Sequence, residues 1–307
     1  MQPIFTTLLN KIIPLYMNIA LGFIAGKTLD MSRETIARIM FFIINPIIIF
    51  NGVMHVDLNA SVLSLPILTF TISCCLCLLF FNITKGLWQD SSRNLIAFSA
   101  GSGNAGYFGL PLALLLFSTE GEGVYILALL GITLYENSVG YYVISHGTTT
   151  SMECVKKVLK LPAIYAFFGA LLLNFSGMEM SDVMLEFTGH IKGTYTVLGM
   201  MIIGLGLAGL SQFEMDGKFI GLSFLAKFLV WPLLIMLITG LDAYFFGFYT
   251  HEIHNALLLL SIVPLAVNTV IMATLVKSQP EKAATAVLLS TLFALAYVPI
   301  MVAWLIN

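Results

Sequence analysis

The stretch GSGNAGYFGLP covers residues 101–111 and lies within a strongly apolar part of the chain. It holds four glycines, a serine, an asparagine and a proline in eleven residues. Glycine permits backbone angles that other residues avoid, and proline removes a backbone donor. The stretch therefore predicts a break in a helix. At membrane depth, such a break needs protein or a water-filled cavity to cover the freed backbone groups.

The composition of the whole chain indicates a membrane protein. Of its 307 residues, 59% are hydrophobic and 10% are charged, and the mean hydropathy is +0.96. A soluble domain is nearer half apolar and a quarter charged. The charges cluster between apolar runs of about 20 residues, which can span ~30 Å of hydrocarbon, and the alternating strands of a β-barrel are absent. We expect an all-α polytopic protein of the cytoplasmic (inner) membrane, embedded in the lipid bilayer and with no nucleic-acid partner.

Apolar segments follow one another along the chain, separated by turn and charge signals such as KSQPEKA (277–283). In that signal, Ser278 and Glu281 have the spacing of a capping box, which predicts the start of a helix. The first segment lacks the basic start and small-residue cleavage site of a signal peptide, so we interpret it as a span. The ten predicted spans are residues 11–29, 36–54, 61–81, 94–117, 122–146, 161–177, 192–210, 217–239, 255–276 and 282–306.

The distribution of Lys and Arg predicts the orientation of these spans, because basic residues favour cytoplasmic loops. Eleven basic residues fall in one set of loops and two in the opposite set, while Lys227 falls within a span. Both termini are therefore expected outside, on the periplasmic side. The larger set is Lys27, Arg33, Arg38, Lys85, Arg93, Lys156, Lys157, Lys160, Lys218, Lys277 and Lys282, and the smaller set is Lys11 and Lys192.

The polar connection 147–160 divides the chain into two halves of five predicted spans each, residues 1–146 and 161–307. An odd number of spans forces the halves into opposite orientations. The fourth span of the second half contains VPLAVNT (263–269), which we interpret as a second break. Interrupted helices at matching places in inverted halves are typical of secondary transporters.

The two breaks together suit a binding site. Gly101, Gly103 and Gly106 loosen the first break, and Pro264 breaks the second. The half-helix ends would attract a carboxylate through their N–H groups, or a cation through their freed carbonyls. Asn104 and Asn268, with Thr269, would add neutral polar groups. The alternative is a glycine-rich helix that packs tightly on a neighbour.

The motifs GNAGYFGLPL (103–112) and VPLAVN (263–268), followed by QPEKAATAVLLSTLFALAYVPI (279–300), resemble the auxin efflux carrier family. That family includes bacterial permeases for malate, malonate and similar organic acids. The likeness covers essentially the whole chain. It implies a fold similar to that of sodium–bile acid symporters, in which spans 1, 2, 6 and 7 form a scaffold and a homodimer platform. Spans 3–5 and 8–10 would form a mobile transport domain, whose broken fourth and ninth spans cross at the substrate site.

The resemblance assigns roles to particular residues. The crossover proline of the second half falls on Pro264, whereas that of the first half falls on Gly103, which departs from the family pattern. The polar residue after the crossover falls on Asn104, followed by Ala105. The later G-x-P motif falls on Gly109 and Pro111.

Other polar residues lie inside predicted spans. Glu136 is the only acid expected there and would be a proton carrier, a sodium ligand or a partner to a base, unless its span sits deeper and it reaches water. Asn137 follows it and points elsewhere on the helix. Lys227 would balance Glu136, attract anions or snorkel to the surface. Asn45 and Pro46 are expected to interrupt the second span, where they would face the substrate or mark a simple proline kink.

No metal site or enzyme active site is expected. Cys74, Cys75 and Cys77 share an apolar run without further ligands, so they are expected to pack as small apolar residues. HEIH (251–254) has histidines three apart in a loop, whereas the H-E-x-x-H motif of zinc proteases needs them four apart on a helix. We find no nucleophile–base constellation and no phosphate-binding motif.

The leading hypothesis from the sequence is a secondary active transporter of a small organic anion, coupled to H⁺ or Na⁺ by symport and working by an elevator-like movement. The alternatives are a sodium-coupled symporter of the bile-acid type, or a channel or uniporter for the same ligands. No cofactor is expected.

Overall fold

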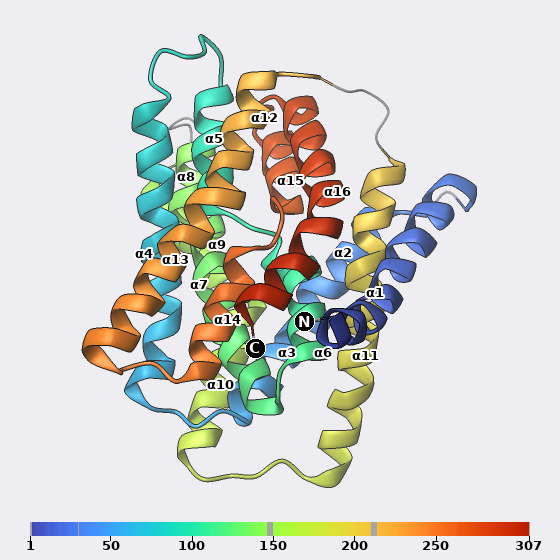
Figure 1. Cartoon of the computed structure of the whole chain (residues 1–307), viewed down its shortest axis with the longest axis vertical. Coiled ribbons are helices and arrows are strands. Elements are labelled where there is room, and N and C mark those ends of the chain that lie inside the picture. The colour runs from blue at the N-terminus through green and yellow to red at the C-terminus, as the bar shows by residue number, and fades with distance from the viewer. Residues whose placement is uncertain (1, 30, 146–149, 210–213, 307) are drawn as a thin grey trace.

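A computed structural model describes residues 2–29, 31–145, 150–209 and 214–306, and the side chains of residues 2–9 are not described. In these ranges the regular secondary structure is all helical and there is no strand (Figure 1). The prediction of an all-α protein is therefore confirmed.

The helices follow one another with short connections. Four of them, labelled η, are π-helical segments that continue directly into a neighbouring α-helix. The bounds are α1 Gln2–Thr28, α2 Arg33–Ile39, η1 Met40–Ile44, α3 Asn45–Met54, α4 Ala60–Ile83, α5 Ser92–Gly101, η2 Ala105–Gly109, α6 Leu110–Leu116, α7 Thr119–Asn137, α8 Val139–Ile144, α9 Ser151–Leu159, α10 Pro162–Phe175, α11 Asp182–Ala208, α12 Gly217–Phe224, η3 Leu225–Val230, α13 Trp231–Leu241, η4 Asp242–Phe246, α14 His251–Ser261, α15 Val267–Leu275 and α16 Pro280–Leu305.

Six helical stretches among the described residues are long and apolar enough to cross a membrane. A seventh is possible if α9 and α10, which meet at a bend of 56°, form one span. The chain is thus a membrane-embedded helical protein by length and composition. The predicted segments 94–117 and 255–276 are not single helices, so they do not enter this count. The six stretches are Arg33–Met54, Ala60–Ile83, Thr119–Ile144, Asp182–Ala208, Gly217–Phe246 and Pro280–Leu305.

Side-chain caps explain where several helices begin. Ser118 accepts a hydrogen bond from Gly121 N at the start of α7, and Thr250 accepts one from Ile253 N at the start of α14. The predicted capping box of Ser278 and Glu281 is wrong. Instead, Gln279 precedes α16 in a left-handed conformation with Pro280 in the first turn, and Ser278 Oγ has no hydrogen-bond partner among the described residues.

The connection 147–160 contains the short helix α9, which begins with a capping box formed by Thr150 and Glu153. Cys154 lies in this helix and is buried. Residues 146–149 lie outside the described ranges. Helix α9 packs against α7 and α8.

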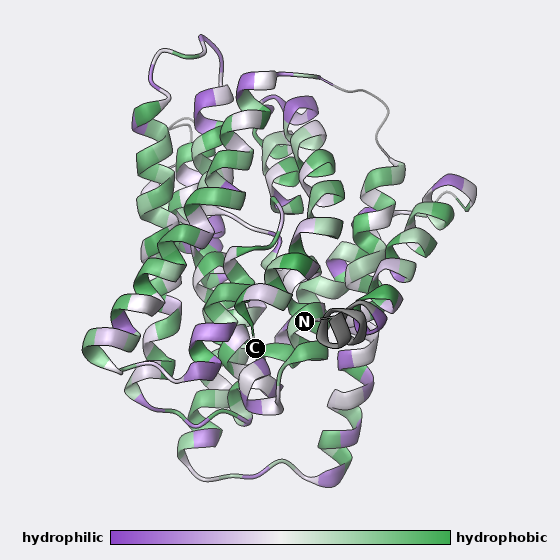
Figure 2. Cartoon of the chain, in the orientation of Figure 1, coloured by the Kyte–Doolittle hydropathy of each residue, from purple (hydrophilic) through white to green (hydrophobic). Residues whose placement is uncertain are grey.

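Certain helices pack in pairs. Helix α1 lies along α11, and α3 lies against α10, whereas α4 packs between α5 and α7 and α15 packs on α16 (Figure 1). Figure 2 shows apolar residues along the lengths of the helices and polar residues gathered at many helix ends and connections. Large apolar side chains remain exposed on the outside, among them Leu172 and Phe246. A lipid environment would bury such an apolar exterior.

Candidate functional site

Two interrupted helices meet in the centre of the molecule. Helix α5 ends at Gly101 and helix η2 begins at Ala105, so residues 102–104 are not helical. Helix α14 ends at Ser261 and α15 begins at Val267, with residues 262–266 between them. Both interruptions predicted from the sequence are present.

A backbone hydrogen bond joins the two breaks. Asn104 N donates to Pro264 O at 2.9 Å. Beside it, Leu265 N donates to the hydroxyl of Ser290 at 3.2 Å. Backbone groups that lost their helical partners at each break are therefore satisfied partly by the other break and by a neighbouring helix, as a buried interruption requires.

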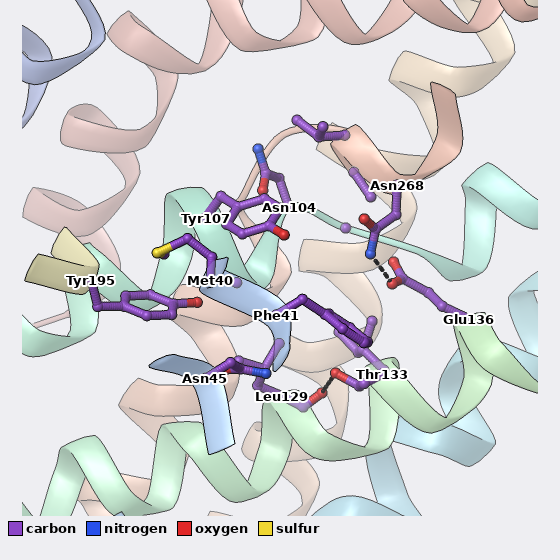
Figure 3. Close-up of a pocket in the computed structure, with 15 residues that line it drawn as sticks. Met40, Phe41, Asn45, Asn104, Tyr107, Leu129, Thr133, Glu136, Tyr195 and Asn268 are labelled. Carbon is purple, nitrogen blue, oxygen red and sulfur yellow. Dashed lines mark hydrogen bonds between the residues drawn. The ribbon is translucent and has the colours of Figure 1, made fainter. Parts of the chain in front are cut away.

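A cavity of about 60 Å³ lies beside the breaks (Figure 3). It is larger than the ~15 Å³ needed for one water molecule. Six predicted site residues line it, and they come from four separate parts of the chain: Asn45, Gly103, Asn104, Gly106, Glu136 and Asn268. The remaining lining residues were not predicted and are mainly apolar or aromatic: Met40, Phe41, Tyr107, Leu129, Ile132, Thr133, Tyr195, Ala266 and Val267.

Glu136 links the two breaks through its side chain. Glu136 is only 4% exposed and lines the cavity. Ser102 Oγ, from the first break, donates to Glu136 Oε1, and Asn268 Nδ2, from the start of α15, donates to Oε2 at 2.7 Å (Figure 3). The alternative that Glu136 reaches water at the outer surface is wrong. Because neutral donors hold both oxygens, the carboxylate position depends on both breaks.

Lys227 is the most deeply buried cation near the site. It lies in η3 and is 0% exposed, so the snorkelling interpretation is wrong. Its Nζ lies 4.5 Å from the centre of the Trp231 ring and has no hydrogen-bond partner among the described residues. No acid of the described part of the chain forms an ion pair with Lys227, although Lys227 and Glu136 are close enough to interact electrostatically. A buried amine without an acceptor in the protein is costly.

Gly103 makes room for Lys227. A methyl group on Gly103 would meet Lys227 Nζ and lie 3.1 Å from its Cε. Gly103 also lines the cavity, so the amine of Lys227 lies beside a residue of the cavity wall. By contrast, a methyl group on Gly106 would meet only the Tyr195 hydroxyl, at 3.5 Å. Position 103, where the family pattern has proline, thus carries a glycine at the place that the amine of Lys227 occupies.

Other predicted residues lie near the breaks but do not line the cavity. Ala105 is buried at the start of η2, and Pro111 is buried near the start of α6. Gly101 ends α5 beneath the Tyr135 ring. Thr269 is buried and its Oγ1 has no partner among the described residues. Asn137 Nδ2 donates to Thr133 O in its own helix at 2.9 Å, which agrees with the expectation that it points elsewhere.

Asn45 lines the cavity without breaking its helix. The expected interruption at residues 45–46 is wrong, because η1 runs directly into α3. A π-helical turn before Pro46 accommodates the missing proline donor within a continuous helix. Asn45 Oδ1 is buried and has no partner within the described ranges, as is also true of Asn104 Nδ2.

Glu136 is not the only acid buried within the helices. Glu122 in α7 is paired with Lys192 of α11 at 2.5 Å. Asp242 in η4 accepts hydrogen bonds from Phe248 N and Tyr249 N. Partners compensate for the burial of these two acids: Lys192, distant in the sequence, for Glu122, and the backbone that follows η4 for Asp242.

The HEIH stretch is helical rather than a loop. His251 begins α14, and His254 Nε2 lies 2.9 Å from Asp242 Oδ2. Among the residues that the structure describes, no cluster of His, Cys, Asp and Glu suits a metal ion. His254 therefore has a structural partner that accounts for its position.

A scan of the chain against models of known protein families finds no match, and a search among curated proteins also finds none. The function must accordingly be argued from the site itself.

Proposed function

We propose that this chain is a secondary active transporter of a small organic anion, as its resemblance to the auxin efflux carrier family implies. The cargo would bind in the central cavity between the two breaks. The observation that carries the proposal is the hydrogen bond from Asn104 N to Pro264 O, which joins two interrupted helices beside a polar cavity. Interrupted helices around a central site are the recurring feature of secondary transporters.

The unpartnered groups around the cavity favour an anion. Lys227 Nζ and Asn104 Nδ2 are buried donors without acceptors among the described residues. The acid beside them, Glu136, already accepts from Ser102 and Asn268. A carboxylate would supply the missing acceptor for these donors, and a charge-assisted hydrogen bond is about twice as strong as a neutral one.

The start of α15 adds to this preference. Ala266, Val267 and Asn268 all line the cavity, and α15 begins at Val267. The first N–H groups of a helix have no partner within the helix and carry partial positive charge. The cavity thus combines a helix N-terminus with an amide and a nearby amine, which suits a carboxylate.

The packing supports a division into two groups of helices. The pairs α1–α11 and α3–α10 would belong to a scaffold, and the broken helices with α4, α7 and α16 to a transport domain. We propose ten spans in two inverted halves, with α5–α6 and α14–α15 as the broken fourth and ninth. The proposal includes a homodimer through the scaffold helices, both termini outside, and movement of the transport domain as an elevator.

Coupling is proposed to involve Glu136. Its carboxylate bridges Ser102 and Asn268, so a change in its protonation or ligation would alter contacts to both breaks. The coupling ion would be H⁺, or Na⁺ in the alternative of a bile-acid-type symporter. A buried ionisable group in a span is a functional candidate on physical grounds.

The test is uptake into proteoliposomes that hold the purified protein. Malate, malonate, succinate, lactate and indole-3-acetate would each be offered with a proton or a sodium gradient. We expect saturable uptake of at least one acid, lost in Asn104→Ala. The matched control is Asn82→Ala, because Asn82 is an exposed amide at the end of α4 that bonds only its own helix. Uptake that does not saturate would indicate a channel, and equal uptake by both variants would contradict the proposed site.

A further inference from the structure

The three arginines of the chain differ in their surroundings. Arg38 forms an ion pair with Glu34 at 2.6 Å. Arg93 Nε donates to Phe81 O at 2.8 Å, and its guanidinium lies over the Phe81 ring at 3.7 Å. Arg33 has neither an ion pair nor a hydrogen bond to its side chain among the described residues. Only Arg33 therefore presents a guanidinium whose five donors await an acceptor.

Arg33 lies in a confined place rather than on open surface. It is partly buried at the start of α2, and its guanidinium covers Gly206 of α11. A methyl group on Gly206 would lie 3.3 Å from Arg33 Cζ and 3.4 Å from Nη1. The guanidinium thus lies against the backbone at Gly206. This contact limits the directions from which a ligand can approach the guanidinium.

A second cavity, of about 30 Å³, opens beside this guanidinium. Helices α2 and α11 form one wall, and α15 and α16 form the other. Apart from Arg33 and Thr291, its lining side chains are apolar: Ile203, Leu207, Val267, Val270, Ala284, Val287 and Leu288, with Gly206. An arginine facing an apolar cleft between packed helices loses hydration, and an anion would restore the lost interactions.

This cavity adjoins the central one. Val267, at the start of α15, lines both. Tyr107 also lines the central cavity and is close enough to Arg33 for an electrostatic interaction. The unpaired guanidinium therefore lies next to the central site, between the helices that the proposed function assigns to the scaffold and to the transport domain.

We propose that Arg33 forms a second, peripheral anion site that receives the carboxylate of the cargo between the central cavity and the basic end of the molecule. The inference rests on the proposed function for its role in transport, but the anion site itself does not require flux. Arginine suits such a site, because its planar fork binds a carboxylate through two parallel hydrogen bonds.

The direct test is chemical protection of the arginines in the wild-type protein. Phenylglyoxal modifies accessible guanidinium groups, and peptide mass spectrometry reports each arginine separately. We expect malonate to slow the modification of Arg33 at least about fivefold and to leave Arg38 unchanged. Neutral malonamide should protect neither. Equal rates at Arg33 with and without malonate would overturn the inference, as would equal protection of Arg33 and Arg38.

A kinetic test separates this site from the central one. Arg33→Gln should raise the KM for uptake from the Arg33 side about tenfold and leave the KM from the opposite side within about twofold, with the ratio of the two maximal rates shifting so that the transport equilibrium is unchanged. Arg38→Gln on the same helix is the matched control, and Arg33→Lys should restore part of the affinity. An equal KM increase from both sides would contradict a peripheral site. Protection of Arg33 without any flux would support the anion site while contradicting the proposed transport.

Discussion

Two buried lysines illustrate how differently one residue type is used in this fold. Lys282, in the first turn of α16, lies 3.2 Å from Asp90, 3.4 Å from both Glu214 and Asp216, and 3.0 Å from Ser92 Oγ. Lys227, in η3, has no acceptor among the described residues. The first lysine is surrounded by carboxylates that hold three helices together. The amine of the second lies over the ring of Trp231 and beside Gly103.

The contrast separates a structural charge from a functional one. A buried ammonium whose donors are paired stabilises the arrangement around it, and the loss of one partner is destabilising. A buried amine without an acceptor stabilises nothing within the fold and is retained at a cost. Lys282 is therefore expected to act on stability, and Lys227 on the binding of an external anion.

The largest effect is expected for Lys227→Met, which keeps the volume of the side chain but removes the amine. The specificity constant for anion uptake should fall about 100-fold, since a hydrogen bond to a charged group contributes about 1.5–3 kcal/mol. The midpoint of thermal unfolding should stay the same or rise. Uptake in proteoliposomes and unfolding in detergent measure the two quantities. Normal uptake by this variant would show that Lys227 is not the anion partner.

The next effect concerns the acid nearest to Lys227. Glu136→Gln should reduce gradient-driven uptake about tenfold, equivalent to about 1.4 kcal/mol. Exchange of anions without a gradient should persist, because glutamine still accepts from Ser102 Oγ and, once the Asn268 amide turns over, donates to Asn268 Oδ1. Uptake measured with and without a proton or a sodium gradient distinguishes these modes. Full gradient dependence in the variant would remove Glu136 as the coupling site.

Substitutions of the two glycines beside the cavity test whether transport needs the space that Lys227 occupies. Gly103→Ala should reduce uptake about tenfold, because its methyl group would displace the lysine head, equivalent to about 1.4 kcal/mol. Gly106→Ala should change uptake by less than about twofold, because its methyl group fits at an ordinary contact distance from Tyr195. The pair is compared by initial rates at equal protein content. Similar losses in both variants would mean that flexibility of the break, and not the space for Lys227, is what matters.

Lys282→Met should leave uptake by the folded protein within about twofold but lower its stability. Three carboxylates, Asp90, Glu214 and Asp216, would lose their shared partner. The free energy of unfolding should fall by roughly 1–3 kcal/mol. Chemical unfolding monitored by tryptophan fluorescence gives this value, with Lys218→Met as the exposed control. Unchanged stability would remove the distinction between the two lysines.

The smallest effect is the pH dependence of this network. Burial acts to raise the pKa of Asp90, but hydrogen bonds from Ser92 and the nearby Lys282 outweigh it and hold the pKa below its ordinary 3.8. Burial and hydrogen bonds oppose each other in the same way at Asp216, whose pKa is also lowered. Because the folded pKa values lie below the unfolded ones, the contribution is fully present above about pH 4 and is lost as the pH falls through the folded values.

The thermal unfolding midpoints of the wild type and Lys282→Met should therefore converge as the pH falls from about 7 to about 3. Differential scanning fluorimetry across this range checks the expectation. A constant difference between the two proteins down to the lowest pH would show that the carboxylates do not depend on Lys282.

Much of the architecture could be predicted from the sequence, because helix breaks and apolar runs are local properties. Glycines at 101, 103 and 106 and the proline at 264 placed both interruptions within a few residues. The burial of Glu136 followed from its apolar neighbours along the chain. The capping box at residue 278 and the interruption at Asn45 failed, because a left-handed Gln279 and a π-helical turn offered the backbone other solutions.

The sequence by itself determined that the chain is helical and membrane-embedded, and where its helices are interrupted, since these depend on apolar length and on residues that cannot continue a helix. Only the tertiary structure decided which charges have partners. Glu122 and Lys192 are 70 positions apart, Lys282 and Asp90 are 192 apart, and Lys227 and Arg33 face neighbours with no acceptor among the described residues. Pairing depends on distances between helices, which no local pattern in the sequence records.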